Sequence, residues 1–151
     1  HNSWIVDFER SGEGHAFQDF VELEADIINR IAFSQDEFPA FYHFCLAVAE
    51  LLPLSELLDK YSSIENKDVL KLLKIIVFIR ELSLKSTKIS DARQYILGLY
   101  FNTIFRATLV PREKYRKSEL RTWMLASILC YRLNHWDNST WPPTEWGNIL
   151  S

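Results

Sequence analysis

Residues that interrupt helices are scarce in this chain, which has only four glycines and five prolines among 151 residues. Between them, apolar residues recur at helical spacing, most densely in DVLKLLKIIVFIRELSL, residues 68–84. Hydrophobic residues make up 48% of the chain, which is enough for one domain to bury a core. The sequence therefore predicts a single, mainly α domain over residues 1–151, in which 68–84 is the most buried helix.

The helical pattern divides into about five packed helices and one short helical segment. Ser34 and Glu37 have capping-box spacing just before the second helix. Ser90 or Asp91 is expected to cap a later helix, and Pro111 to open the last one. The predicted helical segments are 16–31, 38–52, 54–61, 68–84, 89–108 and 111–136, which together form a helical bundle over 16–136, and an irregular tail is expected over 137–151.

Residues 1–15 follow a different pattern. The apolar run WIV ends at Asp7, which predicts a short strand or hairpin remnant over residues 3–8. Two of the four glycines follow in RSGEGH, so this strand is expected to lead into a loop. One strand cannot form a sheet, and the sequence starts at His1. We therefore expect the chain to be the C-terminal fragment of a larger domain.

Charge is distributed unevenly along the sequence. Residues 1–65 carry 3 Lys or Arg against 13 Asp or Glu, whereas residues 66–151 carry 14 against 7. The acidic face of residues 1–65 and the basic face of residues 66–151 could attract each other and hold the domain together, or either could dock a protein partner. The densest basic run, REKYRK, is expected to interact with the acidic half of the chain. Nucleic-acid binding is not expected in a chain of net charge −3.

The sequence also limits the compartment and the classes of site. It has no apolar run long enough for a membrane span and no signal-peptide pattern. Cys45 and Cys130 are the only cysteines, which gives no disulfide framework and favours the cytoplasm. His43 and Cys45 are expected on different faces of a helix, so zinc is not expected there.

Residues 3–26 resemble the aminoglycoside phosphotransferase and choline kinase branch of the protein-kinase-like fold, in which an apolar strand ends in I-D-F/W-E/G. A closer resemblance is to the kinase-like ternary complex associated domains of bacterial signalling and conflict proteins, with W-L-I-D-F-x-R-x-G-x-G-H-x-x-x-D-F-x-x-L-E. The matching positions here are Trp4, Asp7, Phe8, Arg10, Gly12, Gly14, His15, Asp19, Phe20, Leu23 and Glu24. Residues 90–133 resemble the helical end of these modules more loosely.

This resemblance implies a site for Mg²⁺ and ATP in the full-length parent protein. Asp7 would be the metal ligand, and Asp19 would brace the catalytic loop. Glu9 and Arg10 would contribute to cofactor binding. The upstream part of the same kinase-like domain would then be the main partner of this chain.

The sequence departs from the family in one respect that matters for activity. It lacks the catalytic-loop pattern H-G-D-x-x-x-x-N and the glycine-rich loop and lysine that grip the nucleotide. We therefore expect the isolated chain to be inactive. The alternative is a non-enzymatic helical scaffold module of a bacterial signalling or conflict system.

Overall fold

The structure, a computed structural model, describes residues 17–31, 38–50, 54–61, 67–89, 91–109, 116–138, 140–144 and 146. Its helices are α1 (Gln18–Asp26), the π-helical turn η1 (Ile27–Ile31), α2 (Phe38–Val48), α3 (Leu54–Lys60), α4 (Lys67–Thr87), α5 (Ala92–Leu109) and α6 (Arg116–Asn134). The prediction of a mainly α domain is confirmed, and the described ranges contain no strand. The strand expected over residues 3–8 lies outside the described residues.

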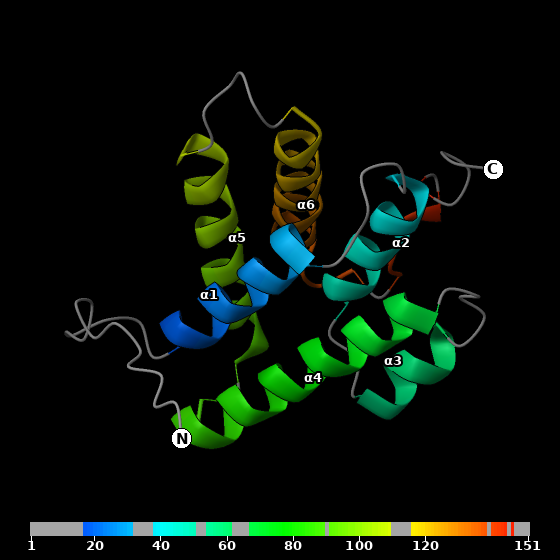
Figure 1. Ribbon diagram of the computed structural model, residues 1–151. Helices are drawn as coiled ribbons and strands as arrows, with labels where there is room; N and C mark the ends of the chain where they lie inside the picture. The colour runs from blue at the N-terminus through cyan, green and yellow to red at the C-terminus, as the bar shows by residue number, and fades with distance from the viewer. Residues whose placement is uncertain are drawn as a thin grey trace, which may run out of the picture.

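The helices form a bundle with two differently oriented groups (Figure 1). α5 and α6 stand side by side and antiparallel, and α1 crosses them and contacts α5. α4 runs across the base of the bundle, where it contacts α1, α2 and α3. α2 packs between α6 and α4. Segments far apart in sequence thus meet around one core.

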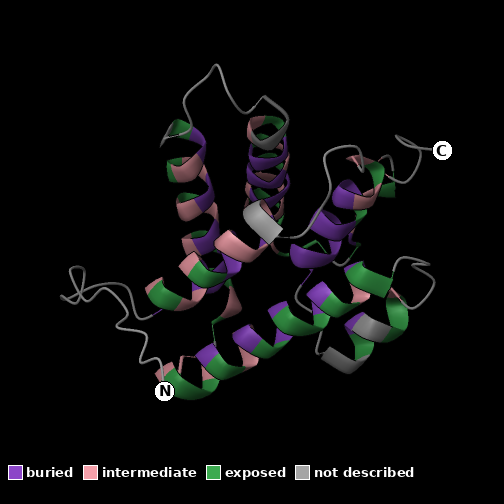
Figure 2. Ribbon diagram, in the orientation of Figure 1, coloured by how far each residue is buried: buried purple, intermediate pink, exposed green. Residues whose placement is uncertain are grey.

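The core lies where the apolar faces of these helices converge (Figure 2). α1, α2, α4, α5 and α6 contribute buried side chains at the i, i+3 and i+4 spacing that their sequences predicted. Among the largest fully buried side chains are Phe17, Phe41, Phe44, Ile28, Leu73, Ile76, Ile96, Leu99, Leu125 and Leu129. This core fixes the positions of α1, which carries Asp19 and Glu24, and of α5, which packs against α1.

The most buried helix is α2, and the expectation that 68–84 would be so is wrong. Between Phe41 and Val48 only His43 is exposed. His43 and the buried Cys45 therefore do lie on different faces, as predicted. α4 instead lies at the edge of the bundle and leaves apolar side chains, Phe78 among them, in solvent.

Helix boundaries agree with the predicted capping chemistry where they are described. Asp91 precedes α5, and its Oδ1 accepts a hydrogen bond of 2.9 Å from the backbone N–H of Arg93. Asp91, one of the two predicted caps, therefore caps α5. Ser34, Glu37 and Pro111, with most of the basic run REKYRK, lie outside the described residues.

The tail packs back onto the bundle through its tryptophans. The Nε1 of Trp141 donates a 2.9 Å hydrogen bond to the carbonyl of Leu46, and the rings of Trp146 and Tyr131 lie 4.6 Å apart. Lys60 joins this tail to the end of α2, because its Nζ donates to the Trp141 carbonyl and pairs with the buried Glu50 at 2.6 Å. None of the helices in these ranges has the length and hydropathy of a membrane span.

Candidate functional site

The segment that carries the family resemblance continues into α1, and α1 is held by a buried ion pair. Glu24 is fully buried, and its two carboxylate oxygens accept hydrogen bonds from Nη2 and Nε of Arg80 on α4, at 2.5 and 3.0 Å. The hydroxyl of Tyr95 on α5 donates a further bond of 2.8 Å to the same carboxylate. One carboxylate thereby joins three helices.

The surroundings of Arg80 and Tyr95 raise the pKa of both groups. Burial by itself lowers the pKa of Arg80, but the adjacent Glu24 carboxylate outweighs it and raises that pKa. Burial, followed by the charge of Glu24, raises the pKa of Tyr95. The buried charge of Glu24 is tolerated because its hydrogen bonds are satisfied by Arg80, which is itself mostly buried, and by Tyr95. The cluster therefore positions α1 and is not free to act on a substrate.

Close packing holds α1 against α5 as well. Phe17, Val21 and Ala25 are buried at successive turns of α1. A Cβ atom placed on Gly98 of α5 would lie 3.4 Å from a methyl group of Val21, so the two helices approach about as closely as a small residue permits. Arg106 of α5 adds an ion pair of 2.5 Å to Asp26 at the end of α1.

Asp19 lies on the opposite side of α1 from Phe17, Val21 and Glu24, which are buried. It is exposed in the first turn, and Leu23, one turn later, is 51% exposed. A carboxylate in the first turn interacts favourably with the helix dipole. Asp7, Glu9 and Arg10 lie outside the described residues.

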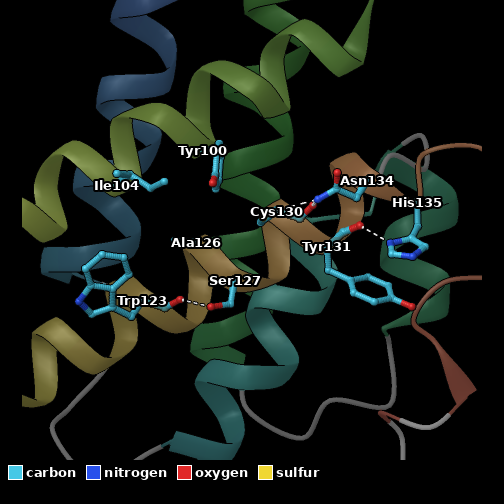
Figure 3. A pocket seen from close by; sticks show the side chains of 9 residues that line it. All are labelled: Tyr100, Ile104, Trp123, Ala126, Ser127, Cys130, Tyr131, Asn134 and His135. Atoms are coloured by element: carbon cyan, nitrogen blue, oxygen red, sulfur yellow. Dashed lines mark hydrogen bonds between the residues drawn. The ribbon is translucent and has the colours of Figure 1, made fainter.

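A cavity of about 420 Å³ lies between α5 and α6 (Figure 3). Its lining consists of Tyr100, Ile104, Trp123, Ala126, Ser127, Cys130, Tyr131, Asn134 and His135. A second cavity, of about 580 Å³, lies between α2, α6 and the tail and is lined by Phe38, Pro39, Tyr42, Met124, Ser127, Ile128, Tyr131 and Trp146. Neither lining contains a formally charged Asp, Glu, Lys or Arg.

His135 and Ser127 of the first cavity are engaged with carbonyl groups of the same helical segment, whereas Tyr100 and Cys130 face each other across the cavity. His135 is directed to the carbonyl of Tyr131, 2.9 Å from Nδ1, and stacks on the Tyr131 ring at 4.0 Å (Figure 3). Ser127 donates to the carbonyl of Trp123 at 2.8 Å. The neighbouring thiol of Cys130 raises the pKa of Tyr100. The cavity therefore shows no nucleophile paired with a general base.

The part of the chain that the structure describes contains no group of three or more metal-ligating His, Cys, Asp or Glu side chains. The two buried acids in these ranges each form an ion pair, Glu24 with Arg80 and Glu50 with Lys60. The predicted magnesium ligand, Asp7, is outside these ranges. What the described residues provide is a rigid support for the start of α1.

An apolar surface runs along α5, a feature that the sequence analysis did not single out. Leu97, Phe101 and Phe105 recur every four residues and are 42%, 61% and 51% exposed. The opposite face of α5 is in the core through Ile96 and Leu99. A helix that is apolar on all sides is normally covered on all sides. The signal in the sequence was the near absence of charge within YILGLYFNTIF.

Searches against protein-family models, curated proteins and solved structures found no match to this chain.

Proposed function

We propose that this chain supplies the C-terminal, mainly helical part of a kinase-like phosphotransferase domain of the aminoglycoside phosphotransferase and choline kinase type. The proposal rests on the segment 3–26, which resembles that family, together with the way its second half is held. Glu24 anchors α1 to α4 and α5, while Asp19 faces away from the bundle. α1 is thus a fixed base for the loop that precedes it.

The two halves of the resembling segment have separate tasks in this proposal. Phe20 and Glu24 are one turn apart and face the bundle, where Phe20 packs against the core. Asp19 and Leu23 are one turn apart and face outward. Phe20 and Glu24 thus hold α1 against the bundle. Asp19 and Leu23 would contact residues outside the bundle. Asp19 would there brace a catalytic loop supplied by the upstream part of the domain.

Mg²⁺ would be held at Asp7, because carboxylate oxygens are the ligands this ion takes in nucleotide sites. The ion, if bound there, would supply positive charge to offset the negative charge that develops during phosphoryl transfer. Glu9 and Arg10 flank this ligand in the sequence and would contact the nucleotide or its metal. The free thiols of Cys45 and Cys130 support a cytoplasmic setting for the protein.

The exposed side of α5 agrees with the same proposal. Leu97, Phe101 and Phe105 form an apolar surface that water does not favour. The remainder of a larger domain would cover it. A second candidate function, a non-enzymatic interaction module, is favoured by the same surface if its cover is a different protein. A complete H-G-D-x-x-x-x-N pattern shortly upstream of Asp7 in the parent protein would select the phosphotransferase.

The test is a titration of the longer parent protein with Mg²⁺-ATP, comparing Asp7→Asn with Glu13→Gln. Both substitutions remove one negative charge from the same stretch of sequence. Asp7→Asn should weaken Mg²⁺-ATP binding by at least about tenfold, whereas Glu13→Gln should change it little. Equal affinity in the Asp7→Asn protein and the unmodified protein would refute the magnesium role.

A further inference from the structure

The outer face of α4 carries an apolar row that no other described helix covers. Ile75, Phe78 and Leu82 are 37%, 63% and 45% exposed. They are spaced by three and four residues, so they lie along one side of the helix. Figure 2 shows this side of α4 turned away from the bundle. The opposite side, with Leu72, Leu73 and Ile76, is in the core.

Lysines surround this row. Lys71 and Lys85 extend it at both ends, at distances of four residues before Ile75 and three after Leu82, and both are exposed. Lys74, four residues before Phe78, is exposed beside it, and Lys67 lies one turn before Lys71. Asp68 and Glu81 are the only acids between Lys67 and Lys85. The row is thus an apolar strip with a basic rim, about 27 Å long from Lys67 to Lys85 at the rise of an α-helix.

The charge of the rim determines which occupant suits the strip. A second copy of the same face would bring lysines against lysines, which costs binding energy. An acidic partner gains both from the buried apolar side chains and from the rim. Because Ile75, Phe78 and Leu82 have the 3–4 spacing of a helix–helix seam, the partner that fits is itself a helix with apolar residues at that spacing.

We propose that the outer face of α4 docks an acidic amphipathic helix from a partner protein. Phe78, the most exposed of the three, is the central apolar contact. Lys71, Lys74 and Lys85 select for Glu or Asp on the flanks of the incoming helix. This interaction is separate from the nucleotide site proposed at Asp7, and it requires no residue of that site.

The test uses the 151-residue chain and a fluorescein-labelled synthetic helix with Leu at positions a and d of each heptad and Glu at e and g. Fluorescence anisotropy gives the dissociation constant. We expect saturable binding that weakens as NaCl is added, because the rim charges are in solvent. A peptide with Lys in place of every Glu should bind at least about tenfold more weakly.

Variants of exposed side chains locate the binding face without disturbing the core. Phe78→Ala should raise the dissociation constant by about fivefold or more, and Phe101→Ala on α5, which is similarly exposed, should leave it unchanged. The triple change K71E/K74E/K85E should raise it by more than about tenfold, while K71R/K74R/K85R retains the charge and should keep the affinity. Circular dichroism confirms that each variant is folded.

Three outcomes would overturn the proposal. One is binding of the acidic peptide that is insensitive to Phe78→Ala and to K71E/K74E/K85E. Another is equal affinity for the acidic and the basic peptide. The third is that phosphatidylserine vesicles or duplex DNA bind through these residues while the acidic peptide does not, which would assign the face to a membrane or a nucleic acid.

Discussion

Arg80 of α4 binds both carboxylate oxygens of Glu24 on α1, and Glu24 is completely buried. This pair links α1, the second half of the family-like segment 3–26, to α4 at the base of the bundle. Its removal tests how firmly α1 is held. Glu24→Ala leaves the Arg80 guanidinium buried beside Tyr95 without its countercharge, so the free energy of unfolding should fall by about 3–5 kcal/mol.

The measurement is urea unfolding monitored by circular dichroism. A matched control is Asp19→Ala, which removes an exposed carboxylate from the same helix and should cost less than about 1 kcal/mol. The double variant Glu24→Leu/Arg80→Met should recover much of the loss, because apolar pairs commonly replace buried ion pairs without penalty. A loss below about 1 kcal/mol for Glu24→Ala would contradict the anchoring role.

Gly98 tests the close approach of α1 and α5. Its Cβ position lies 3.4 Å from Val21, which is ordinary contact for one methyl group. Gly98→Ala should therefore be tolerated, with a gain of up to about 1 kcal/mol from helix propensity. Gly98→Leu places further carbons against Val21 and should cost about 1–3 kcal/mol. If the leucine variant is as stable as the alanine variant, the two helices do not pack this closely.

Alkaline pH should destabilise the fold through its buried tyrosines. Burial, with a contribution from Glu24 or Glu50, raises the pKa of both Tyr95 and Tyr61 above the usual value near 10. The folded state therefore keeps these protons while the unfolded state releases them. Stability is complete below pH about 10 and is lost above it, by up to about 1.4 kcal/mol per pH unit for each tyrosine.

Urea unfolding from pH 8 to pH 11 measures this effect. Comparison with Tyr61→Phe and Tyr95→Phe isolates the contribution of each tyrosine to this pH dependence. Each substitution should reduce the slope above pH 10, although its free energy at pH 8 falls by about 1 kcal/mol or more through the lost hydrogen bond. Slopes identical to that of the unmodified chain would show that neither tyrosine carries the effect.

The apolar side of α5 provides a test of what covers it. In the 151-residue chain Phe101 is 61% exposed, so Phe101→Ser should change the free energy of unfolding by less than about 0.5 kcal/mol. In the longer parent protein the same change should cost at least about 2 kcal/mol, because the ring would be buried against upstream residues. Small effects in both proteins would favour a separate partner as the cover, and hence the scaffold function.

Periodicity predicted most of the fold, because burial of apolar stripes decides where helices form. It did not predict which face of 68–84 is exposed. Lys71 and Lys74 lie on that face, but the apolar Ile75 and Phe78 lie on it too, so the polar residues alone do not identify it. The partner of Glu24 was also beyond reach, because Arg80 is 56 residues away and only the packing of α1 on α4 brings them together.

The candidate site was predicted only in its outline. Asp19 was identified from a motif, and the structure adds that it faces outward while Glu24, five residues later in the same motif, faces the core. The spacing of the two residues already predicts this difference. Five residues on a helix turn through about 500°, which is one full turn plus about 140°, so Asp19 and Glu24 point to different sides. The η1 turn at Ile27–Ile31 had no signal in the sequence.

The central claim is that this chain completes a nucleotide site together with upstream residues. Isothermal titration of Mg²⁺-ATP into the longer parent protein and into the 151-residue chain tests it most directly. We predict that the longer protein binds Mg²⁺-ATP and that the 151-residue chain neither binds nor hydrolyses it. Absence of binding to both proteins, or equal binding to both, would refute the proposed nucleotide site.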